Sequence, residues 1–212
     1  MPAPDRLPQR QIDVTDLACR RGERLLFSNL GFSLAPGRAL LVRGPNGTGK
    51  TTLIRTLAGL IAPDAGSIAI AGRSEEERPG TDMHLLAHAS GVKGRLTVEE
   101  NLAFWRAVNG GSGDAGEALD IVGLRGIADL EAGHLSAGQT RRLALARLIV
   151  APRPIWLLDE PTAALDAEGD ALVGRLIDSH LAQGGLCIAA THLPLALADT
   201  DRIATLTLGG AA

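Results

Sequence analysis

The sequence of 212 residues predicts an α/β fold built around a mostly parallel sheet. Three observations carry this prediction. Short apolar runs separated by Arg-Gly and Pro-Gly turns fill residues 11–43, helical periodicity dominates residues 97–148, and apolar strands alternate with helices from residue 155 onward. Strands that alternate with helices are typical of a parallel sheet covered on both faces, and the long helical stretch is expected to form an inserted subdomain.

The expected elements follow the chain in order. A β-rich opening, with strands in the runs IDVTDLA, RLLF, LGFSL and RALLVR, ends directly in a glycine at position 44. A helix begins at residue 51 and stops at residues 59–63, where a glycine and a proline interrupt the apolar periodicity. The later elements are a strand at 66–72, a solvated loop at 73–82, a strand that begins at 83, helices over 97–148 broken at 109–116, a strand at 155–158, a helix at 167–182, a strand at 186–190, a short helix at 194–199 and an edge strand at 202–208.

Length and composition bound the organisation of the chain. Residues 1–212 are expected to form one domain, with 11–82 and 151–212 as the β-rich core and 83–150 as the helical subdomain. The 21 Lys and Arg residues against 24 Asp and Glu residues give a net charge of −3 without a long basic run, so nucleic acid is not expected as a partner. No run of 18 apolar residues occurs, so membrane association is expected through partners only.

A glycine-rich loop predicts a phosphate-binding site. Residues 44–51 match the pattern G-x-x-x-x-G-K-[ST], which lies between an expected strand and an expected helix. Glycines let successive backbone N–H groups turn toward phosphate oxygens, and the helix N-terminus favours negative charge. Lys50 can reach the β- and γ-phosphates of ATP, and the Thr51 hydroxyl can bind Mg²⁺. The expected nucleotide-binding residues are Gly44, Pro45, Asn46, Gly47, Thr48, Gly49, Lys50, Thr51 and Thr52.

Two carboxylates follow the apolar strand at 155–158. Asp159 and Glu160 are placed where ligands of parallel sheets bind, beyond the carboxyl ends of the strands. Asp159 is expected to hold Mg²⁺, and Glu160 to polarise the water that attacks the γ-phosphate. The alternative is an acidic pair that caps a helix before Pro161, which is less favoured beside the glycine loop.

A third motif is the run LSAGQ at residues 135–139. A hydroxyl and small residues at a helix start form an anion-binding surface, although Ser136 could also be an ordinary N-cap. The position of Ser136, 23 residues ahead of Asp159, favours the functional interpretation. Arg141 and Arg142, on the helix that follows, are interpreted as a solvated face.

Taken together, these motifs resemble the ATP-binding subunits of ABC transporters. The run LSAGQ looks like that family's signature loop, residues 164–166 (ALD) like its D-loop, and His192 like its switch histidine. The resemblance implies a P-loop NTPase core with an N-terminal antiparallel β subdomain and an inserted helical subdomain.

The resemblance also implies a head-to-tail homodimer in the ATP state. In that dimer Ser136, Gly138 and Gln139 of one copy complete the other copy's site, Asp166 couples the two sites, and His192 contacts the γ-phosphate. As a single histidine after a strand, His192 could instead have a structural role.

Within that family, residues 91–105, 135–148 and 159–169 are similar to the haem-exporter ATPases of bacterial cytochrome c maturation. This similarity implies a peripheral subunit on the cytoplasmic face of the bacterial inner membrane, bound to the integral membrane subunits of a haem-handling complex. ATP hydrolysis would drive release of the haem-loaded periplasmic chaperone. The alternatives are the ATPase of another small exporter, a soluble ABC ATPase outside transport, and a nucleotide-binding scaffold without turnover.

The sequence departs from the family at two positions. No glutamine occurs between residues 12 and 138, so the family's loop glutamine is absent or its role falls to a residue in the region of His88, Ala89 or Ser90. The family also commonly stacks adenine on an aromatic ring ahead of the glycine loop. This chain has no tyrosine, and Arg20 or Arg21 is the expected replacement, because a guanidinium plane can stack on a base.

Overall fold

The computed structural model describes residues 6–73 and 80–209. Part of the loop expected at 73–82 therefore lies outside the described residues. The strands are β1 (Gln11–Arg21), β2 (Arg24–Leu34), β3 (Ala39–Arg43), β4 (Ala65–Ala71), β5 (Met83–Leu86), β6 (Ile155–Asp159), β7 (Leu186–Ala190) and β8 (Ile203–Thr207). The α-helices are α1 (Lys50–Leu57), α2 (Val98–Asn109), α3 (Ala115–Ile121), α4 (Ala137–Val150) and α5 (Ala167–Ala182), with short 3-10 helices at Arg125–Ile127, Ala132–His134 and Thr200–Arg202.

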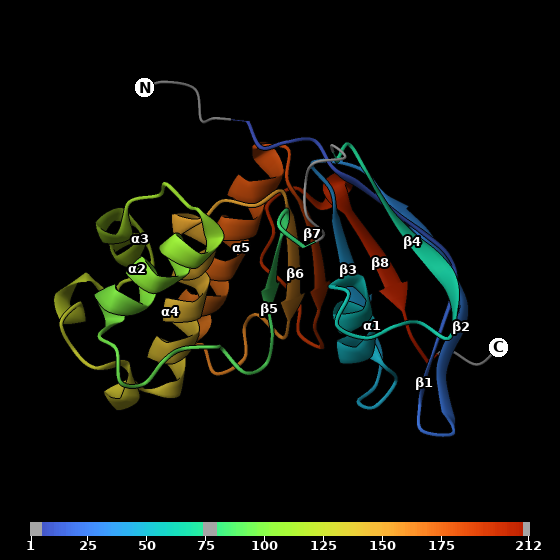
Figure 1. Ribbon diagram of the computed structural model, residues 1–212, viewed down its shortest axis with the longest axis horizontal. Helices are drawn as coiled ribbons and strands as arrows, with labels where there is room; N and C mark the ends of the chain where they lie inside the picture. The colour runs from blue at the N-terminus through green and yellow to red at the C-terminus, as the bar shows by residue number, and fades with distance from the viewer. Residues whose placement is uncertain (1–5, 74–79, 210–212) are drawn as a thin grey trace.

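The strands form two sheets (Figure 1). The antiparallel sheet has the order β2-β1-β4, and the five-stranded sheet has the order β5-β6-β7-β3-β8, with parallel pairing throughout. The expected parallel sheet and N-terminal antiparallel sheet are both confirmed. The last strand lies at the edge, as its sequence indicates.

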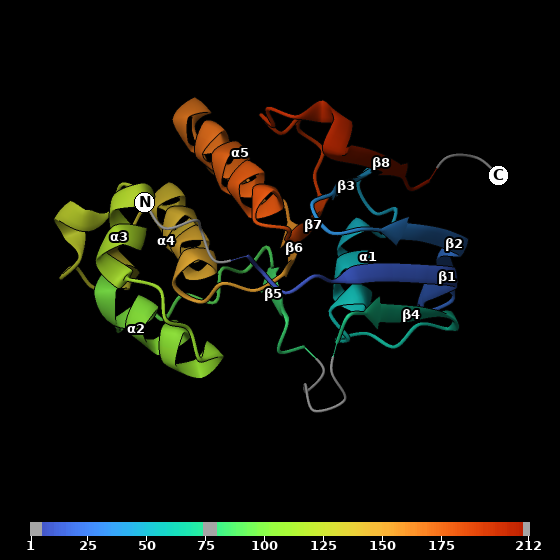
Figure 2. The ribbon, with the colours of Figure 1, turned by 90° about the horizontal axis from the view of Figure 1, so that it is seen from above.

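Alternating residues of the parallel strands divide the interior into two cores. Leu40 and Val42 of β3 face the core shared with α1 and the antiparallel sheet, whereas Ala39 and Leu41 face the core shared with α4 and α5. Figure 2 shows this layering, with α1 between the two sheets and the helical part on the opposite side. Burial on both faces explains why β3, β6 and β7 are almost continuous apolar runs.

Three elements differ from expectation. The runs RLLF and LGFSL form a single strand, β2. Asn29, between the two runs, adopts a left-handed φ of 51°, and the pairing of β2 with β1 shifts register nearby. The strand continues through this irregularity, as strands with a bulge do.

Residues 194–199 form no helix. This segment packs closely on α5, where a Cβ at Gly174 would lie 2.0 Å from the Ala196 carbonyl oxygen, and the Ala198 N–H donates to Asp178 (3.0 Å) instead of to a helical carbonyl.

The third difference concerns the start of the helical part. Leu86 of β5 pairs with Leu158 of β6, so residues 83–86 belong to the parallel sheet. We therefore propose that the helical subdomain begins after Leu86 rather than at Met83. Helices α2, α3 and α4 pack on one another in this part, and α4 leads back toward the sheet.

Candidate nucleotide-binding and hydrolysis site

The site lies beyond the carboxyl ends of β3, β6 and β7. The loop that follows β3 requires glycine at two of its positions. Gly44 has a φ of 140°, and a Cβ there would lie 2.2 Å from the Leu208 carbonyl oxygen. Gly49 has a φ of 104°, and a Cβ there would lie 3.1 Å from the Leu26 Cβ. Both positions combine a left-handed backbone with a close neighbour, so no other residue fits without rearrangement.

Lys50 is the first residue of α1 and is nearly buried. Its ammonium group donates to the carbonyl oxygens of Gly44 (2.7 Å) and Pro45 (3.1 Å). The Thr48 hydroxyl also donates to the Pro45 carbonyl (2.9 Å). These bonds hold the ammonium group at the loop, where it can bind an anion that the loop surrounds.

Asp159 ends β6 and faces α1. The Thr51 hydroxyl donates to its Oδ1 at 3.1 Å, so the two residues expected at Mg²⁺ are in contact. Burial raises the pKa of the Asp159 carboxyl, the hydrogen bond from Thr51 opposes this shift, and the nearby charge of Glu160 adds to it. A divalent cation at these two oxygens would offset the cost of the buried negative charge.

Glu160 has an unusual backbone conformation. Its φ of 48° lies in the left-handed region, which costs a residue with a Cβ about 1–2 kcal/mol. The Glu160 N–H donates to the Ala190 carbonyl at 2.8 Å, at the end of the neighbouring strand β7. The side chain reaches His192, whose Nδ1 lies 2.9 Å from Oε2. The structure therefore brings together the two residues that the sequence predicts to be catalytic.

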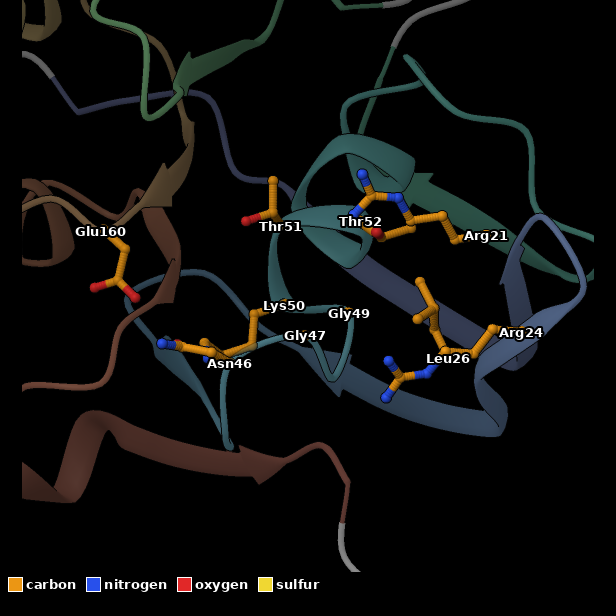
Figure 3. A pocket seen from close by; sticks show the side chains of 10 residues that line it. All are labelled: Arg21, Arg24, Leu26, Asn46, Gly47, Gly49, Lys50, Thr51, Thr52 and Glu160. Atoms are coloured by element: carbon orange, nitrogen blue, oxygen red, sulfur yellow. The ribbon is translucent and has the colours of Figure 1, made fainter.

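A cavity of about 360 Å³ lies over the glycine loop (Figure 3). Its lining residues are Arg21, Arg24, Leu26, Asn46, Gly47, Gly49, Lys50, Thr51, Thr52 and Glu160. In Figure 3 Glu160 lies on the opposite side of the loop from the β1 and β2 residues. The glycine loop and the predicted carboxylate thus border the same cavity.

The arginines that line the cavity differ from the first expectation. Arg20 is not among the residues that line the cavity; its backbone N–H donates to Asp64 (2.6 Å) and its side chain to the Glu23 carbonyl (3.5 Å). Arg21, the other expected candidate, does line the cavity. Arg24 and Leu26 were not expected. Their positions after the Gly22 turn of the hairpin are the signal that could have identified them.

Ser136, Gly138 and Gln139 lie at the start of α4 and are not part of the cavity lining. Ser136 and Gln139 cap the helix reciprocally, with each side chain accepting from the other residue's backbone N–H at 3.2 and 2.9 Å. The N-cap interpretation is therefore correct for the local structure, and it is compatible with a further role. A Cβ at Gly138 would lie 3.0 Å from the Ala164 carbonyl oxygen, so this turn packs on the loop before α5.

Asp166 is the N-cap of α5 and is largely exposed. Its Oδ1 accepts from the Gly169 N–H at 2.8 Å and from Arg142 at 3.2 Å. The hydrogen bond from Gly169 is the main reason that the pKa of Asp166 is lowered. The ion pair connects the expected D-loop to α4.

The interpretation of Arg141 as a solvated residue is wrong. Its guanidinium group is buried and donates to backbone carbonyl oxygens. The acceptors are Pro161 (3.0 Å), Ala87 (2.9 Å), Asp159 (2.8 Å) and Glu160 (2.5 Å). An Arg-Arg pair in a helix gives no local signal for burial, because the acceptors belong to segments distant in sequence.

Of the three residues considered in place of the missing loop glutamine, His88 is the one that acts electrostatically on Asp159. It follows β5 and is exposed, and its charge acts on Asp159 in the direction that lowers the pKa of that carboxyl. Ala89 has no polar side chain. Ser90 borders a crevice with Trp105 and Arg147, away from the glycine loop.

A parallel α/β sheet with a phosphate loop after one strand and an acidic pair after its neighbour defines a P-loop nucleotide hydrolase. Comparison with known proteins narrows this class. Residues 27–163 match the protein family described as ABC transporter.

Curated relatives are similar along nearly the whole chain. The chain is 53% identical over 193 residues to the "Cytochrome c biogenesis ATP-binding export protein CcmA" of Rhizobium meliloti, covering 88% of this chain and 93% of that protein. It is 50% identical over 197 residues to the protein of the same name from Rhizobium johnstonii, covering 88% and 90%. The chain belongs to the ABC transporter ATP-binding family, and within it to the cytochrome c biogenesis ATP-binding export proteins.

Solved structures agree on the fold. A putative ABC transporter ATP-binding protein from Pyrococcus furiosus aligns with a TM-score of 0.78 at 24% identity, covering 93% of this chain and 97% of that chain. A bacterial Atm1-family ABC exporter with ATP bound also aligns with a TM-score of 0.78, at 23% identity, covering 98% of this chain and 40% of that chain. These structures show the fold, and the family match together with the curated relatives makes the chain an ABC-type ATPase.

Proposed function

We propose that this chain is the ATP-hydrolysing subunit of a haem export and haem-chaperone release complex in cytochrome c biogenesis. One observation carries the proposal: about half of the residues are identical, over about nine-tenths of the chain, to curated cytochrome c biogenesis ATP-binding export proteins. The phosphate loop, buried aspartate and paired glutamate and histidine supply the chemistry that such a subunit needs.

The triphosphate binds over the glycine loop. Backbone N–H groups of residues 44–49 and the start of α1 surround the β- and γ-phosphates, and Lys50 and Thr52 contact their oxygens. Thr51 and Asp159 hold Mg²⁺, because a hydroxyl and a buried carboxylate in contact are the hard oxygen donors that this cation prefers. When bound, Mg²⁺ neutralises negative charge on the β- and γ-phosphate oxygens.

Glu160 orients and polarises the attacking water. Its carboxylate borders the cavity and is held by His192 Nδ1, which leaves the other ring nitrogen of His192 available to the γ-phosphate. This pairing fixes the carboxylate in one orientation at the edge of the site. Positioning of this kind supplies much of the rate enhancement in phosphoryl transfer, where little covalent chemistry falls to the protein.

Two copies complete each other's sites. Ser136, Gly138 and Gln139 lie outside the cavity of their own chain, and the helix start that they form can receive a phosphate of the partner's ATP. Asp166 lies beside this turn through its pair with Arg142 and couples the two sites. Hydrolysis removes the γ-phosphate that bridges the two copies, so the dimer is the ATP state.

The base lies against the hairpin formed by β1 and β2. Arg21 and Arg24 line this end of the cavity together with Leu26, and they support guanidinium stacking by Arg21 in place of Arg20. A guanidinium plane and a leucine offer flat and apolar surface without hydrogen bonds specific for adenine. Selectivity among nucleotide bases is therefore loose.

The chain acts at the cytoplasmic face of the bacterial inner membrane, bound to integral membrane subunits of the haem-handling complex, and not to nucleic acid. Among the helices of residues 6–73 and 80–209, none is long and apolar enough to cross a membrane. We propose that contact with the membrane runs through the partner subunits.

This function is tested in cells by replacing the chromosomal gene with a Glu160→Gln variant. The expected result is loss of mature c-type cytochromes together with haem that stays bound to its periplasmic carrier. An Arg175→Ala variant, which alters an exposed arginine of α5, serves as the control with normal cytochromes. Normal cytochrome content in the Glu160→Gln strain, with the variant present at the usual level, would refute the haem assignment.

A further inference from the structure

Arg141 connects the start of the helical part to the catalytic edge of the sheet. It lies in α4, and its side chain is 5% exposed. The four hydrogen bonds of its guanidinium group go to Ala87, directly after β5, and to three consecutive residues where β6 ends, Asp159, Glu160 and Pro161. One side chain thus ties three segments together at the point where both predicted carboxylates emerge.

The chemistry of these contacts indicates a specific role. Burial lowers the pKa of Arg141, while the negative charges of Asp159 and Glu160 act in the opposite direction and favour the charged form. A buried cation that bonds only neutral carbonyls is costly, and an apolar residue of similar volume would fill the same space without that cost. The planar five-donor geometry of arginine matches several carbonyls at once, which a single ammonium group does not.

The backbone of Glu160 shows what these bonds hold. Its left-handed φ of 48° is unfavourable for a glutamate and persists only where neighbouring contacts fix it. Three hydrogen bonds do so: the Glu160 N–H donates to Ala190, and the Glu160 carbonyl accepts from the Arg141 guanidinium group and from the Ala163 N–H. Rotation of this peptide out of the left-handed region would move the carboxylate away from His192 and from the cavity.

We propose that Arg141 is a positioning residue for ATP hydrolysis, which holds Glu160 in the conformation that presents its carboxylate to the attacking water. The inference rests on the proposed role of Glu160. It assigns Arg141 no contact with nucleotide, so loss of the guanidinium group should slow the chemical step and leave ATP binding by the glycine loop intact.

The test compares Arg141→Met, Arg141→Lys and Arg147→Met in the full-length chain. Arg147 is the matched control, because it is a buried arginine of the same helix that donates to the Leu85 carbonyl (2.7 Å) and packs on Trp105 but does not reach Asp159 or Glu160. Melting temperature, dissociation constant for a fluorescent ATP analogue, KM and kcat are measured for each variant.

We expect kcat of Arg141→Met to fall at least about tenfold with a dissociation constant within about twofold of the original chain. Arg141→Lys should recover part of the rate, whereas Arg147→Met should lose thermal stability and keep kcat within about twofold. Equal losses of kcat in the Arg141→Met and Arg147→Met variants would overturn the inference in favour of a general structural role.

A double variant tests whether Arg141 acts through Glu160. If it does, adding Arg141→Met to Glu160→Gln should not reduce the residual hydrolysis further, because contacting residues in one pathway are not additive. A further tenfold loss in the double variant would contradict the inference.

The single variants distinguish failure of the inference from failure of the proposed function. If the Glu160→Gln variant alone retains full turnover, the proposed role of Glu160 fails. Full turnover in Arg141→Met beside an inactive Glu160→Gln would defeat only the inference about Arg141.

Discussion

At the scale of single residues, the site combines a buried negative charge with groups that offset it only in part. Asp159 lies in contact with Thr51 and beside Glu160, and the net effect of burial and of the second carboxylate is a raised pKa. The charged form of Asp159 therefore weakens the folded state in the absence of a bound cation. Such a cost is typical of residues kept for function rather than for stability.

Asp159→Asn should accordingly raise the melting temperature, by about 2 °C or more, while abolishing hydrolysis that depends on Mg²⁺. The amide keeps an acceptor for Thr51 and removes the buried charge. Because the pKa of Asp159 is raised in the folded state, the gain is largest at neutral pH and shrinks as the pH falls through that pKa. Differential scanning calorimetry checks this, with Asp120→Asn on the exposed side of α3 as the control. A variant that melts below the original chain would show that the carboxylate is stabilising.

At the scale of elements, two packed elements each contain a buried neutral histidine. His84 of β5 donates from Nε2 to the Ala151 carbonyl (2.5 Å), and His180 of α5 donates from Nε2 to the Leu186 carbonyl (3.1 Å) and stacks on Trp156 at 3.9 Å. Burial lowers the pKa of His84 to about 3 and that of His180 to about 4. Both side chains are therefore neutral near neutral pH, because burial disfavours the charged imidazolium.

These pKa values predict acid sensitivity with a definite sign. The unfolded chain binds protons at its histidines from about pH 6.5 downward and the folded chain does not, so the free energy of unfolding decreases as the pH falls below that value. At pH 5 each of the two residues accounts for about 2 kcal/mol of this loss. Urea titrations at pH 7.5 and 5 measure it, and His84→Leu should reduce the loss between the two pH values. An unchanged pH dependence in that variant would show that His84 is protonated in the folded state.

The elements also show which parts of the structure could be predicted from sequence. The glycine loop and the acidic pair were predictable, because each motif is continuous in sequence and its function depends on backbone geometry next to a strand. The burial of Arg141 was not predictable, since its acceptors lie directly after β5 and where β6 ends. The missing helix at 194–199 follows from close packing on Gly174, a tertiary contact that overrides an apolar pattern.

At the scale of the whole molecule, the fold presents two separate surfaces that carry predicted nucleotide-binding residues. The cavity with Lys50 and Glu160 is one surface, and the start of α4 with Ser136 is the other. The second is not part of the first within one chain, and the dimer proposed above would bring the two together. Arg141 joins α4 to the carboxylate edge within each chain, so a change at one surface is mechanically connected to the other.

The measurement that tests this account most directly is the mass of the Glu160→Gln variant by analytical ultracentrifugation, with and without saturating ATP and Mg²⁺. A dimer that forms only with ATP, holds two nucleotides and is lost on adding Ser136→Glu is the predicted result. A particle of one chain at saturating ATP, from a protein whose unmodified form hydrolyses ATP at full rate under the same conditions, would contradict the shared site.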